Sequence, residues 1–593
     1  MSMLARADGA SAASHDTDDL AAAAQGWLTQ FENALARRDA ATLRTLFHPD
    51  THWRDVLALT WGLTTVSGAE EIVAALAAHA DAKPRDFMLA AGRTPPRRVK
   101  RAGLETIEAI FDFETPIGRG AGVLRLTGSA KAWTFLTALE ELKGYEERLG
   151  KRRPTGQSHS RDFRGPNWLD QRKAAATYAD HDPDVLVVGG GQAGLSIAAR
   201  LRQLDIDTLI VDREKRIGDN WRNRYHALTL HNQVQVNHLP YMPFPPSWPT
   251  YIPKDKLAGW FEAYVEALEL NYWTSTELVA GSYDAQTQRW SVTLTRDGTT
   301  RTMQPRHIVM ATGVSGIPNL PDIPTLKDFR GEVLHSSQYR DGEDWNGKRA
   351  IVIGTGNSGH DIAQDLYSSG AEVTLVQRSP TLIVNIEPSA QLAYAMYDEG
   401  PSLEDCDLLA LSTPLAVGRK SHQLLTQQGK ALDQPLLDRL EQKGFKLDWG
   451  DDGTGWQFKY LTRGGGYYFN VGCSDLVAEG KVRLAQFSDI ARFTAAGAEL
   501  RDGAAIAADL IVLATGYKGQ EHLVAKLFGA DIASRVGPIW GFGPDQELRN
   551  MYARTRQPGL WFIAGSLAQC RINSKYLALQ IKAIEQGLLA KQV

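Results

Sequence analysis

Two stretches of the chain combine short runs of apolar, β-branched residues with longer segments in which apolar residues recur at helical spacing. In each stretch an apolar run is followed by a helical pattern and then by a second apolar run. This order of strand, helix and strand predicts two α/β units with parallel sheets. The runs and helical patterns occupy residues 185–188, 195–201 and 208–211 in the first stretch, and 351–353, 361–366 and 372–376 in the second.

The residues before position 150 follow a different pattern. Apolar residues at helical spacing run through residues 21–47, and His48-Pro-Asp interrupts them. A second helix is expected from Ser67, where Glu70 completes a sequence that resembles a capping box. Helices followed by several strands predict a separate α+β domain. The expected strands cover residues 51–61, 106–113, 120–127 and 132–137.

Other segments complete the expected domain organisation. The first 20 residues are rich in Ala, Ser and Asp and predict a disordered tail. Residues 388–456 look helical, and their leucine stripe predicts core and no site, with Pro435 in the first turn of a helix. The expected order is a tail (1–20), the α+β domain (21–150), a basic linker (151–180), the first unit (181–328), the second unit (329–510, with the insertion 388–456) and a return to the first unit (511–593).

Composition limits the classes of function. The chain has 593 residues, a net charge of −4 and only three cysteines, which form no CxxC pair. A charge this close to zero predicts no general attraction to nucleic acid. Without a redox dithiol, the disulfide-reductase class of two-dinucleotide flavoproteins is excluded, and so few cysteines suit a reducing cytoplasm. We expect no signal peptide and no membrane span, because no apolar run approaches the roughly 18 residues that a span needs.

Each α/β unit carries a glycine-rich turn between its first strand and its helix. Glycines in the pattern GxGxxG permit a tight turn, a close approach to a pyrophosphate, and packing of the helix on the strand. The anion then lies at a helix N-terminus. One such turn would leave a plain tight turn as the alternative, but two in the same context predict that two dinucleotides meet. The glycines are Gly189, Gly191 and Gly194 in the first turn, and Gly354, Gly356 and Gly359 in the second.

The residues after the second strand of each unit distinguish the two ligands. Asp212 ends that strand in the first unit, and its carboxylate suits the ribose hydroxyl of FAD or NAD while repelling a 2′-phosphate. The second unit has Gln377, Arg378 and Ser379 there, which suits the 2′-phosphate of NADPH. The alternative for Arg378 is a solvated loop cation. Because Gln377 is uncharged, NADH stays open as a second donor.

A fixed-spacing motif between the two units carries a family resemblance. Phe329, Gly331, His335 and Tyr339 reproduce the FxGxxxHxxxY fingerprint of the flavin-containing monooxygenases, which are close kin of the Baeyer–Villiger monooxygenases. The resemblance covers residues 184–582. The other segments that look like this family are residues 217–221, 225–232, 251–256, 311–313, 514–517 and 559–565.

The resemblance implies a fold, cofactors and an activity. The fold class is α/β, with Rossmann-like FAD and NADPH domains that follow the α+β domain in the chain. NADPH would reduce FAD, and O2 would add at flavin C4a to give a peroxide or hydroperoxide that oxygenates a small ketone, thioether or amine. The residues expected to hold FAD are Gly189, Gly191, Gly194, Asp212 and Trp221. Those expected at the NADPH side are Gly354, Gly356, Asn357, Ser358, Gly359, Arg378, Ser379 and Thr515.

Three residues are candidates for the chemistry itself. Six positions after Tyr225, where many family members have an asparagine, this chain has His231, followed by Asn232. The histidine resembles the plant auxin-forming branch and a bacterial subgroup, and a titratable ring there favours carbonyl substrates. A purely structural histidine is the alternative. His335 is the third candidate, as part of the linker between domains, and packing is its alternative role.

The N-terminal pattern resembles the cone-shaped domains of the NTF2 and SnoaL superfamily. In such a cone His52, Arg54 and Asp55 are candidates for an inward dyad, but neighbours on a strand alternate faces, so a polar rim is the preferred interpretation. We expect this domain to contact the nicotinamide end of the active site. The whole chain is expected to act as a homodimer in the cytoplasm, without nucleic acid or membrane partners. The alternative function is a flavin redox sensor or NAD(P)H oxidase that regulates a partner.

Overall fold

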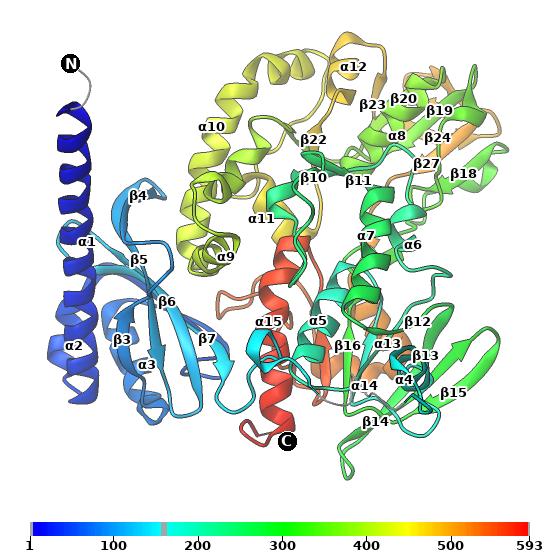
Figure 1. The fold of residues 1–593 in the computed structure, drawn as a ribbon. Coiled ribbons are helices and arrows are strands. Elements are labelled where there is room, and N and C mark those ends of the chain that lie inside the picture. The colour runs from blue at the N-terminus through cyan, green and yellow to red at the C-terminus, as the bar shows by residue number, and fades with distance from the viewer. Residues whose placement is uncertain (1–3, 156–162, 591–593) are drawn as a thin grey trace.

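The computed structural model describes residues 4–155 and 163–590, which form three packed units. Figure 1 shows the N-terminal unit in blue and cyan beside the red helix α15 (Leu567–Glu585). The two α/β units lie on the other side of that helix, with a yellow helical insertion above the N-terminal unit. None of the helices formed by the described residues combines the length and the apolar character that a membrane crossing requires.

The N-terminal unit is an α+β unit, as predicted, with three helices and one seven-stranded sheet whose first two strands lie between the second and third helices. The sheet order is β2-β1-β7-β6-β5-β3, with β4 paired to β5, and only β1 and β7 run parallel. The helices are α1 (Leu4–Ala36), α2 (Ala40–Leu46) and α3 (Ala69–Ala78). The strands are β1 (Phe47–Val56), β2 (Leu63–Ser67), β3 (Arg85–Leu89), β4 (Arg97–Arg101), β5 (Leu104–Glu114), β6 (Gly118–Leu126) and β7 (Ala132–Leu142).

Two local expectations for this unit were wrong. Helix α1 begins at Leu4, so most of the stretch expected to be a disordered tail is helical; it is rich in alanine, the best helix former. Helix α3 starts after Gly68, and no side chain caps it. The capping box expected from Ser67 therefore does not form, because that residue is the last of strand β2.

Aromatic rings fill the space between α1 and the sheet. The ring of Phe31 lies 4.9 Å from Phe135 and 5.4 Å from Phe87, and Phe111 stacks on Phe135 at 5.3 Å. Gly122 makes room for this cluster, since a Cβ atom there would lie 2.1 Å from the Phe111 ring. The interior of the unit is therefore a packed core and not a ligand chamber.

The first α/β unit has the predicted parallel sheet, in the order β12-β9-β8-β16-β29. Its strands are β8 (Val185–Val188), β9 (Thr208–Val211), β12 (Asn271–Trp273), β16 (His307–Met310) and β29 (Leu560–Phe562). Its helices are α4 (Trp168–Ala175), α5 (Gln192–Gln203), α6 (Asp219–Arg222), α7 (Lys254–Ala267), α13 (Glu521–Phe528), α14 (Ala530–Val536) and α15. Smaller sheets hold β10 (Thr229–Gln233), β11 (Tyr251–Pro253), β13 (Thr276–Asp284), β14 (Arg289–Arg296) and β15 (Thr299–Met303).

The second α/β unit repeats this architecture with the sheet order β18-β27-β19-β20-β23. Strand β27 belongs to this sheet, so the chain returns to the first unit after residue 513 and not at residue 511 as expected. The elements are β18 (Glu332–His335), β19 (Arg349–Ile353), α8 (Asn357–Ser368), β20 (Glu372–Gln377), α12 (Cys473–Glu479), β23 (Arg483–Gln486), β24 (Ile490–Thr494), β25 (Gly497–Leu500), β26 (Ala505–Ala507) and β27 (Leu510–Leu513).

Two linkers and one insertion connect these parts. The linkers pair as the short antiparallel strands β17 (Ile317–Pro318) and β28 (Tyr517–Lys518). The insertion comprises β21 (Leu382–Asn385), η7 (Ala390–Asp398), α9 (Leu403–Leu411), α10 (Leu415–Gln442), α11 (Gly455–Arg463) and β22 (Tyr467–Asn470). Pro435 lies inside α10, not in its first turn as expected. The helix continues past the proline because Leu436, Leu437 and Leu440 pack into the core of the second unit.

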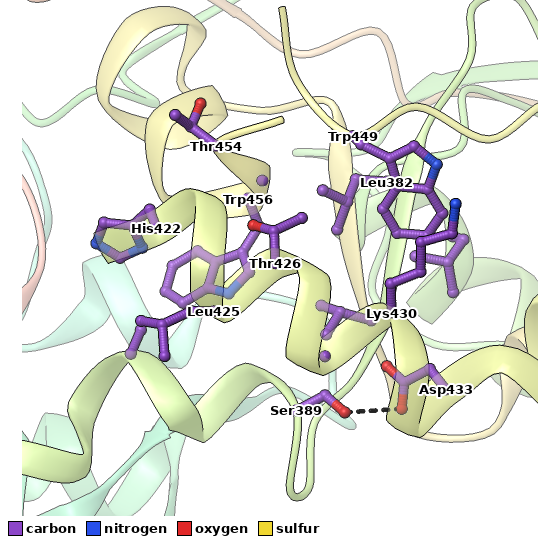
Figure 2. Close-up of a pocket in the computed structure, with 15 residues that line it drawn as sticks. Leu382, Ser389, His422, Leu425, Thr426, Lys430, Asp433, Trp449, Thr454 and Trp456 are labelled. Atoms are coloured by element: carbon purple, nitrogen blue, oxygen red, sulfur yellow. Dashed lines mark hydrogen bonds between the residues drawn. The ribbon is translucent and has the colours of Figure 1, made fainter. Parts of the chain in front are cut away.

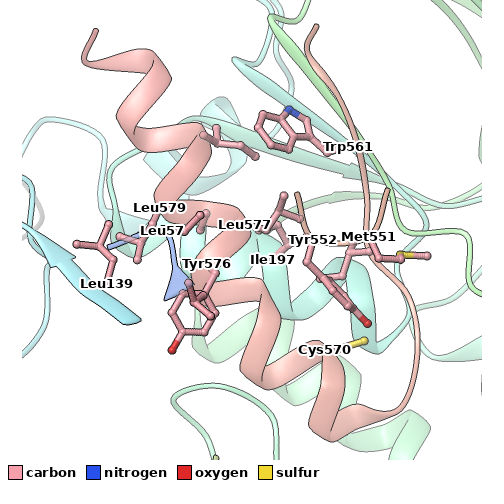
Figure 3. Close-up of a cluster of buried hydrophobic side chains, with 14 of the residues drawn as sticks. Leu57, Leu139, Ile197, Met551, Tyr552, Trp561, Cys570, Tyr576, Leu577 and Leu579 are labelled. Carbon is pink, nitrogen blue, oxygen red and sulfur yellow. The ribbon is translucent and has the colours of Figure 1, made fainter. Parts of the chain in front are cut away.

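The N-terminal unit shares a core with the first α/β unit. Figure 3 shows helix α15 between the two, with Leu139 of β7 on one side and Ile197 of α5 on the other. Tyr576, Leu577 and Leu579 of α15 belong to the same buried cluster. This continuous apolar contact makes the N-terminal unit an integral part of the fold.

Candidate active site

The first glycine loop has the geometry that a bound pyrophosphate requires. Gly189 adopts φ +107°, and a Cβ atom there would lie 2.5 Å from the carbonyl oxygen of Ala311. A Cβ atom on Gly194 would lie 1.9 Å from the carbonyl oxygen of Gly189. Gly191 is the N-cap residue of α5. Bare backbone therefore meets the positive end of a helix dipole at this turn.

Asp212 and Trp221 complete the arrangement around the first loop. The buried carboxylate of Asp212 accepts hydrogen bonds from the backbone N–H groups of Gly190 (2.6 Å) and Glu214 (2.8 Å), which fix it beside the turn. Trp221 packs against the cores of both α/β units. Its buried indole Nε1 has no hydrogen-bond partner among the described residues. An anchored acceptor, a glycine cradle and an unpaired donor fit a bound flavin dinucleotide.

The second glycine loop repeats this geometry. Gly354 has φ +119°, and a Cβ atom there would lie 2.3 Å from the carbonyl oxygen of Ala514. The corresponding atom on Gly359 would lie 1.9 Å from the carbonyl oxygen of Gly354. Gly356 caps α8, whose first residues are Asn357 and Ser358. Asn357 accepts a hydrogen bond from the backbone N–H of Phe469 (3.0 Å), which ties this loop to strand β22.

The position that holds Asp212 in the first unit holds Gln377 in the second. The Gln377 side chain is buried and turned away from the loop, since it exchanges two hydrogen bonds of 2.8 Å with the backbone of Lys446. Arg378 and Ser379 are exposed at the end of β20. Within the part of the chain that the structure describes, Arg378 makes no ion pair. A free guanidinium without a nearby competing acid fits a 2′-phosphate.

The fingerprint residues connect the second unit to the linkers. Phe329 and Tyr339 are buried, and the Tyr339 hydroxyl donates to Asp365 (2.6 Å). Both ring nitrogens of His335 have partners, the Ser337 hydroxyl (2.9 Å) and the carbonyl oxygen of Gly516 (3.1 Å). His335 thus joins strand β18 to the second linker, and a catalytic role for it stays a prediction.

Thr515 lies in the same linker. Its hydroxyl donates to the carbonyl oxygen of Asn319 (2.6 Å), and the side chain of Asn319 donates back to the carbonyl of Thr515 (3.3 Å). These bonds join the two linkers to each other. Thr515 therefore sets the spacing of the two units, and contact with a cofactor stays a prediction.

His231 and Asn232 lie on β10, between the first unit and the insertion. The His231 ring is 5.2 Å from the ring of Phe469 on β22. Burial lowers the pKa of His231 to about 4, so its imidazole is neutral at neutral pH. No other described residue forms a hydrogen bond to its ring nitrogens. The ring is thus available as a neutral hydrogen-bonding group, not as a standing cation.

Two residues of the insertion contact His231 and Asn232. The amide of Gln391 on η7 donates to the carbonyl oxygen of His231 (3.1 Å) and leaves its own buried Oε1 without a partner. Tyr394, one turn further, forms a hydrogen bond with the side chain of Asn232, and burial raises the pKa of its phenol. Residues from a segment expected to hold no site therefore surround the predicted catalytic pair.

Four aromatic rings form a cluster beside this pair. Trp456 is in contact with three of them, at 5.9 Å from Tyr394, 6.0 Å from Tyr467 and 4.8 Å from Phe469. This cluster was not predicted from the sequence. The signal was present, because residues 467 and 469 of a strand share one face and both are aromatic.

Trp456 also borders a pocket in the insertion, with about 410 Å³ of empty space that is partly open to solvent. Figure 2 shows Trp456 near Leu425 and Thr426 of α10, and Trp449 and Lys430 on the opposite side. The Lys430 ammonium lies over the Trp449 ring, 4.7 Å from its centre. Asp433 accepts a hydrogen bond from Ser389 at the end of the pocket (2.8 Å). The pocket is therefore apolar and aromatic with a few polar groups, which is typical of small-molecule sites.

The N-termini of two helices meet at the base of the site. Gln192, the first residue of α5, donates to the carbonyl oxygen of Gly565 just before α15 (3.1 Å). Tyr460 of the insertion donates to Gln569 in the first turn of α15 (2.9 Å). Two positive helix ends at one place favour a bound anionic group.

These features define a class of protein, a two-dinucleotide flavoprotein oxidoreductase. Residues 186–399 match the family model described as pyridine nucleotide-disulphide oxidoreductase. The three cysteines are buried and unpaired, at positions 406, 473 and 570, so the match reflects the dinucleotide-binding architecture and not dithiol chemistry.

Comparison with curated proteins narrows the class. Indole-3-pyruvate monooxygenase YUCCA1 of Oryza sativa subsp. japonica is 30% identical over 371 residues, which are 62% of this chain and 85% of the rice protein. Probable indole-3-pyruvate monooxygenase YUCCA7 of Arabidopsis thaliana is 30% identical over 344 residues, 56% of this chain and 74% of that protein. The chain belongs to the flavin-containing monooxygenase family.

Solved structures agree with this fold. Cyclohexanone monooxygenase with bound epsilon-caprolactone superposes with a TM-score of 0.51 at 18% identity, over 69% of this chain and 89% of that one. OTEMO in complex with FAD and NADP gives a TM-score of 0.50 at 16% identity, over 70% and 88% of the two chains. At these identities the likeness is one of fold.

Proposed function

We propose that this protein is an FAD- and NADPH-dependent monooxygenase that transfers one oxygen atom of O2 to a small carbonyl compound. The observation that carries the proposal is the contrast between the two glycine loops. After the second strand the first unit has an anchored carboxylate, Asp212, whereas the second unit has an uncharged Gln377 followed by the exposed guanidinium of Arg378. This contrast supports two different dinucleotides in one chain, and family membership supports the oxygenation.

FAD is assigned to the first unit and NADPH to the second. When bound, FAD would supply the hydride acceptor for NADPH and the group that activates O2. The chain positions the two cofactors by the glycine loops and by the linker contacts of His335 and Thr515. The tandem helix N-termini at Gln192 and Gly565 supply positive potential beside the first loop.

His231 and Asn232 are proposed to border the reacting atoms. A neutral imidazole can donate or accept one hydrogen bond without adding charge to a dry site. Asn232 is oriented by its hydrogen bond with Tyr394, and the ring of Phe469 covers His231 from the insertion side. These rings would keep water away from the reacting atoms, so that activated oxygen is transferred to the substrate and not lost as H2O2.

The pocket beside Trp456 supports a planar or alicyclic substrate. Its walls are aromatic and aliphatic, and the exposed Lys430 stands at one side. Two of the similar proteins are named for indole-3-pyruvate and cyclohexanone, which are both carbonyl compounds with a ring. Baeyer–Villiger oxidation or oxidative loss of a carboxyl group next to the carbonyl are the favoured outcomes. Oxidation of sulfur or nitrogen is the second candidate chemistry.

A substrate panel tests the proposal. Purified holoenzyme is incubated with NADPH, O2 and either indole-3-pyruvate, cyclohexanone or thioanisole, and products and H2O2 are quantified. We expect oxygenated product from a carbonyl compound, in amounts that match most of the NADPH consumed. Release of all consumed NADPH equivalents as H2O2 with every compound would instead support the oxidase or sensor alternative.

The N-terminal unit is proposed to be an NTF2-like module without an activity of its own. Three helices together with one mainly antiparallel seven-stranded sheet support this assignment. The phenylalanine cluster around Phe31 and Phe135 fills the place where a cone would hold a ligand. A structural role inside the monooxygenase is therefore the better interpretation.

A further inference from the structure

The sheet of the N-terminal unit turns one face to its own core and the other to the rest of the chain. Asp55 points inward, where its carboxylate accepts hydrogen bonds from the hydroxyls of Thr137 (2.6 Å) and Thr60 (2.7 Å). Arg54, its neighbour on β1, points outward as strand alternation requires. The Arg54 guanidinium donates to both carboxylate oxygens of Glu547 (2.8 and 2.6 Å).

Residues of the N-terminal unit form hydrogen bonds with both ends of helix α9 of the insertion. At the helix start, Asp405 accepts hydrogen bonds from the backbone N–H (2.8 Å) and the hydroxyl (2.6 Å) of Thr94. At the helix end, Arg54 donates to the carbonyl oxygen of Leu411 (2.6 Å). Arg125 lies beside it, buried against Glu108 (2.8 Å), and donates to the carbonyl oxygen of Ser412 (3.4 Å). Guanidinium groups at a helix C-terminus satisfy its free carbonyls and its negative dipole end.

A third attachment holds the end of η7. Glu399 follows η7 directly and accepts hydrogen bonds from Arg97 (2.8 Å) and Arg101 (2.6 Å) of strand β4. Gln391 in the first turn of η7 and Tyr394 in its middle contact His231 and Asn232. The N-terminal unit is thus joined to the predicted catalytic pair through one short segment.

A second branch runs through α9. Asp407 of α9 accepts two hydrogen bonds of 2.7 Å from Arg571 on α15. The buried Arg571 also donates to the carbonyl oxygens of Val236 (2.8 Å) and His238 (2.7 Å), which follow strand β10. Two routes therefore lead from the N-terminal unit to residues 231–238, and a hydrogen bond from the Tyr397 hydroxyl of η7 to Asp407 (2.9 Å) joins them.

We propose that the N-terminal unit is a positioning module for the active site, and that Glu399 and Asp407 are the positioning residues through which it acts. By clamping η7 and α9, it fixes the backbone that carries His231 and Asn232. The proposal rests on the proposed function, in which this pair borders the reacting atoms. The proposed role of Glu399 and Asp407 is to fix the geometry of the active site. Neither residue is proposed to contact a substrate or cofactor.

The test compares Glu399→Gln and Asp407→Asn with the wild type as full-length holoenzyme. Hydrogen–deuterium exchange is followed in the peptide that covers residues 229–238. We expect amide exchange there to become at least tenfold faster in each variant. The fraction of NADPH consumed as H2O2 should rise at least twofold, while FAD content stays at the wild-type level.

Asp205→Asn is the matched control. Arg148 and Asp205 form another two-bond ion pair (2.6 and 2.5 Å) between the N-terminal unit and the first α/β unit, and this pair touches neither η7 nor α9. We expect this variant to leave exchange in residues 229–238 and the H2O2 fraction unchanged. If the variants only loosened the N-terminal unit in general, exchange in residues 229–238 would become faster in Asp205→Asn as well. That result would overturn the assignment to Glu399 and Asp407.

The outcomes separate this proposal from the proposed function. Unchanged exchange in residues 229–238 in both variants would overturn the positioning role, even if the wild type oxygenates substrate. A wild type that makes only H2O2 would reject the proposed function, while the exchange data would still decide the positioning role. If Asp407→Asn fails to fold, the half-exposed Glu399 permits the same test alone.

Discussion

The phenol of Tyr225 donates a hydrogen bond to Oδ2 of Asp361 at 2.5 Å, across the boundary between the two α/β units. Tyr225 belongs to the segment that leads to His231, and Asp361 lies in the second turn of α8, directly after the second glycine loop. Desolvation raises the pKa of the partly buried Asp361 carboxyl to about 6; the hydrogen bond from Tyr225 opposes this shift, and repulsion from Asp365 adds to it. One partly buried carboxyl group thus connects the two dinucleotide units.

The raised pKa of Asp361 predicts a pH-dependent contribution to stability. A carboxyl whose folded pKa lies above the unfolded value of about 3.9 binds protons more tightly when folded, so the free energy of unfolding falls as pH rises from about 4 to 6. At about 1.4 kcal/mol per pKa unit, the loss is on the order of 2–3 kcal/mol. In Asp361→Asn this loss disappears, so the thermal midpoint of the variant should rise relative to the wild type between pH 4 and 6.

Asp365→Asn is the control for this measurement. Asp365 lies one turn further along α8 and also accepts a hydrogen bond from a tyrosine, Tyr339. This variant keeps the Asp361 carboxyl and should keep most of the pH dependence. Parallel pH profiles for the wild type and Asp361→Asn would show that the Asp361 carboxyl does not titrate in this range.

Arg378 is predicted to select NADPH over NADH. A hydrogen-bonded charge pair with a phosphate contributes about 1.5–3 kcal/mol, so Arg378→Ala should raise KM for NADPH about 10- to 100-fold. KM for NADH, which lacks the 2′-phosphate, should change less than twofold. Steady-state NAD(P)H oxidation measures both. Arg483→Ala removes another exposed arginine of the same sheet, paired with Glu372, and should change neither value. Equal effects of Arg378→Ala on the two donors would remove the phosphate assignment.

His231 is predicted to act as a neutral group. Because burial holds its pKa near 4, the activity profiles of the wild type and His231→Asn should have the same shape between pH 6 and 8. Their levels should differ roughly tenfold, since His231→Asn loses the hydrogen bond that the imidazole is proposed to make to the reacting atoms, which is worth about 1–2 kcal/mol. We expect the activity of His231→Asn to fall more for carbonyl oxidation than for thioanisole oxidation, with activity measured as product formed per NADPH consumed.

Replacing the exposed His226 by Asn provides the control, because its side chain lies outside the cluster around Phe469. An inflection between pH 6 and 8 that vanishes only in His231→Asn would show that the ring titrates there after all. Unaltered carbonyl oxidation in His231→Asn would remove the preference for carbonyl substrates.

How much could be predicted from the sequence depended on whether the interactions are local. Both glycine loops and their strands were predicted, because turn geometry and apolar runs are local signals. The contacts of Tyr394 with Asn232 and of Phe469 with His231 were not, since they join residues more than 150 positions apart. The grip of Arg54 on α9 is equally long-range. Pro435 shows the same limit, because packing of the whole helix outweighed a local preference.

Each cofactor site can be tested on its own, because a single added methyl group should disrupt one glycine loop and leave the other intact. A Cβ atom on Gly194 or on Gly359 would lie 1.9 Å from a backbone carbonyl oxygen of its own loop, so Ala at either position must displace that loop. Gly194→Ala should yield protein without bound flavin, visible as loss of the absorbance near 450 nm. Gly359→Ala should retain flavin and lose NADPH-dependent reduction at least 100-fold. Gly259→Ala, on the open side of α7, should behave as the wild type. If Gly359→Ala lost flavin and Gly194→Ala retained it, the assignment of FAD to the first unit and NADPH to the second would be reversed.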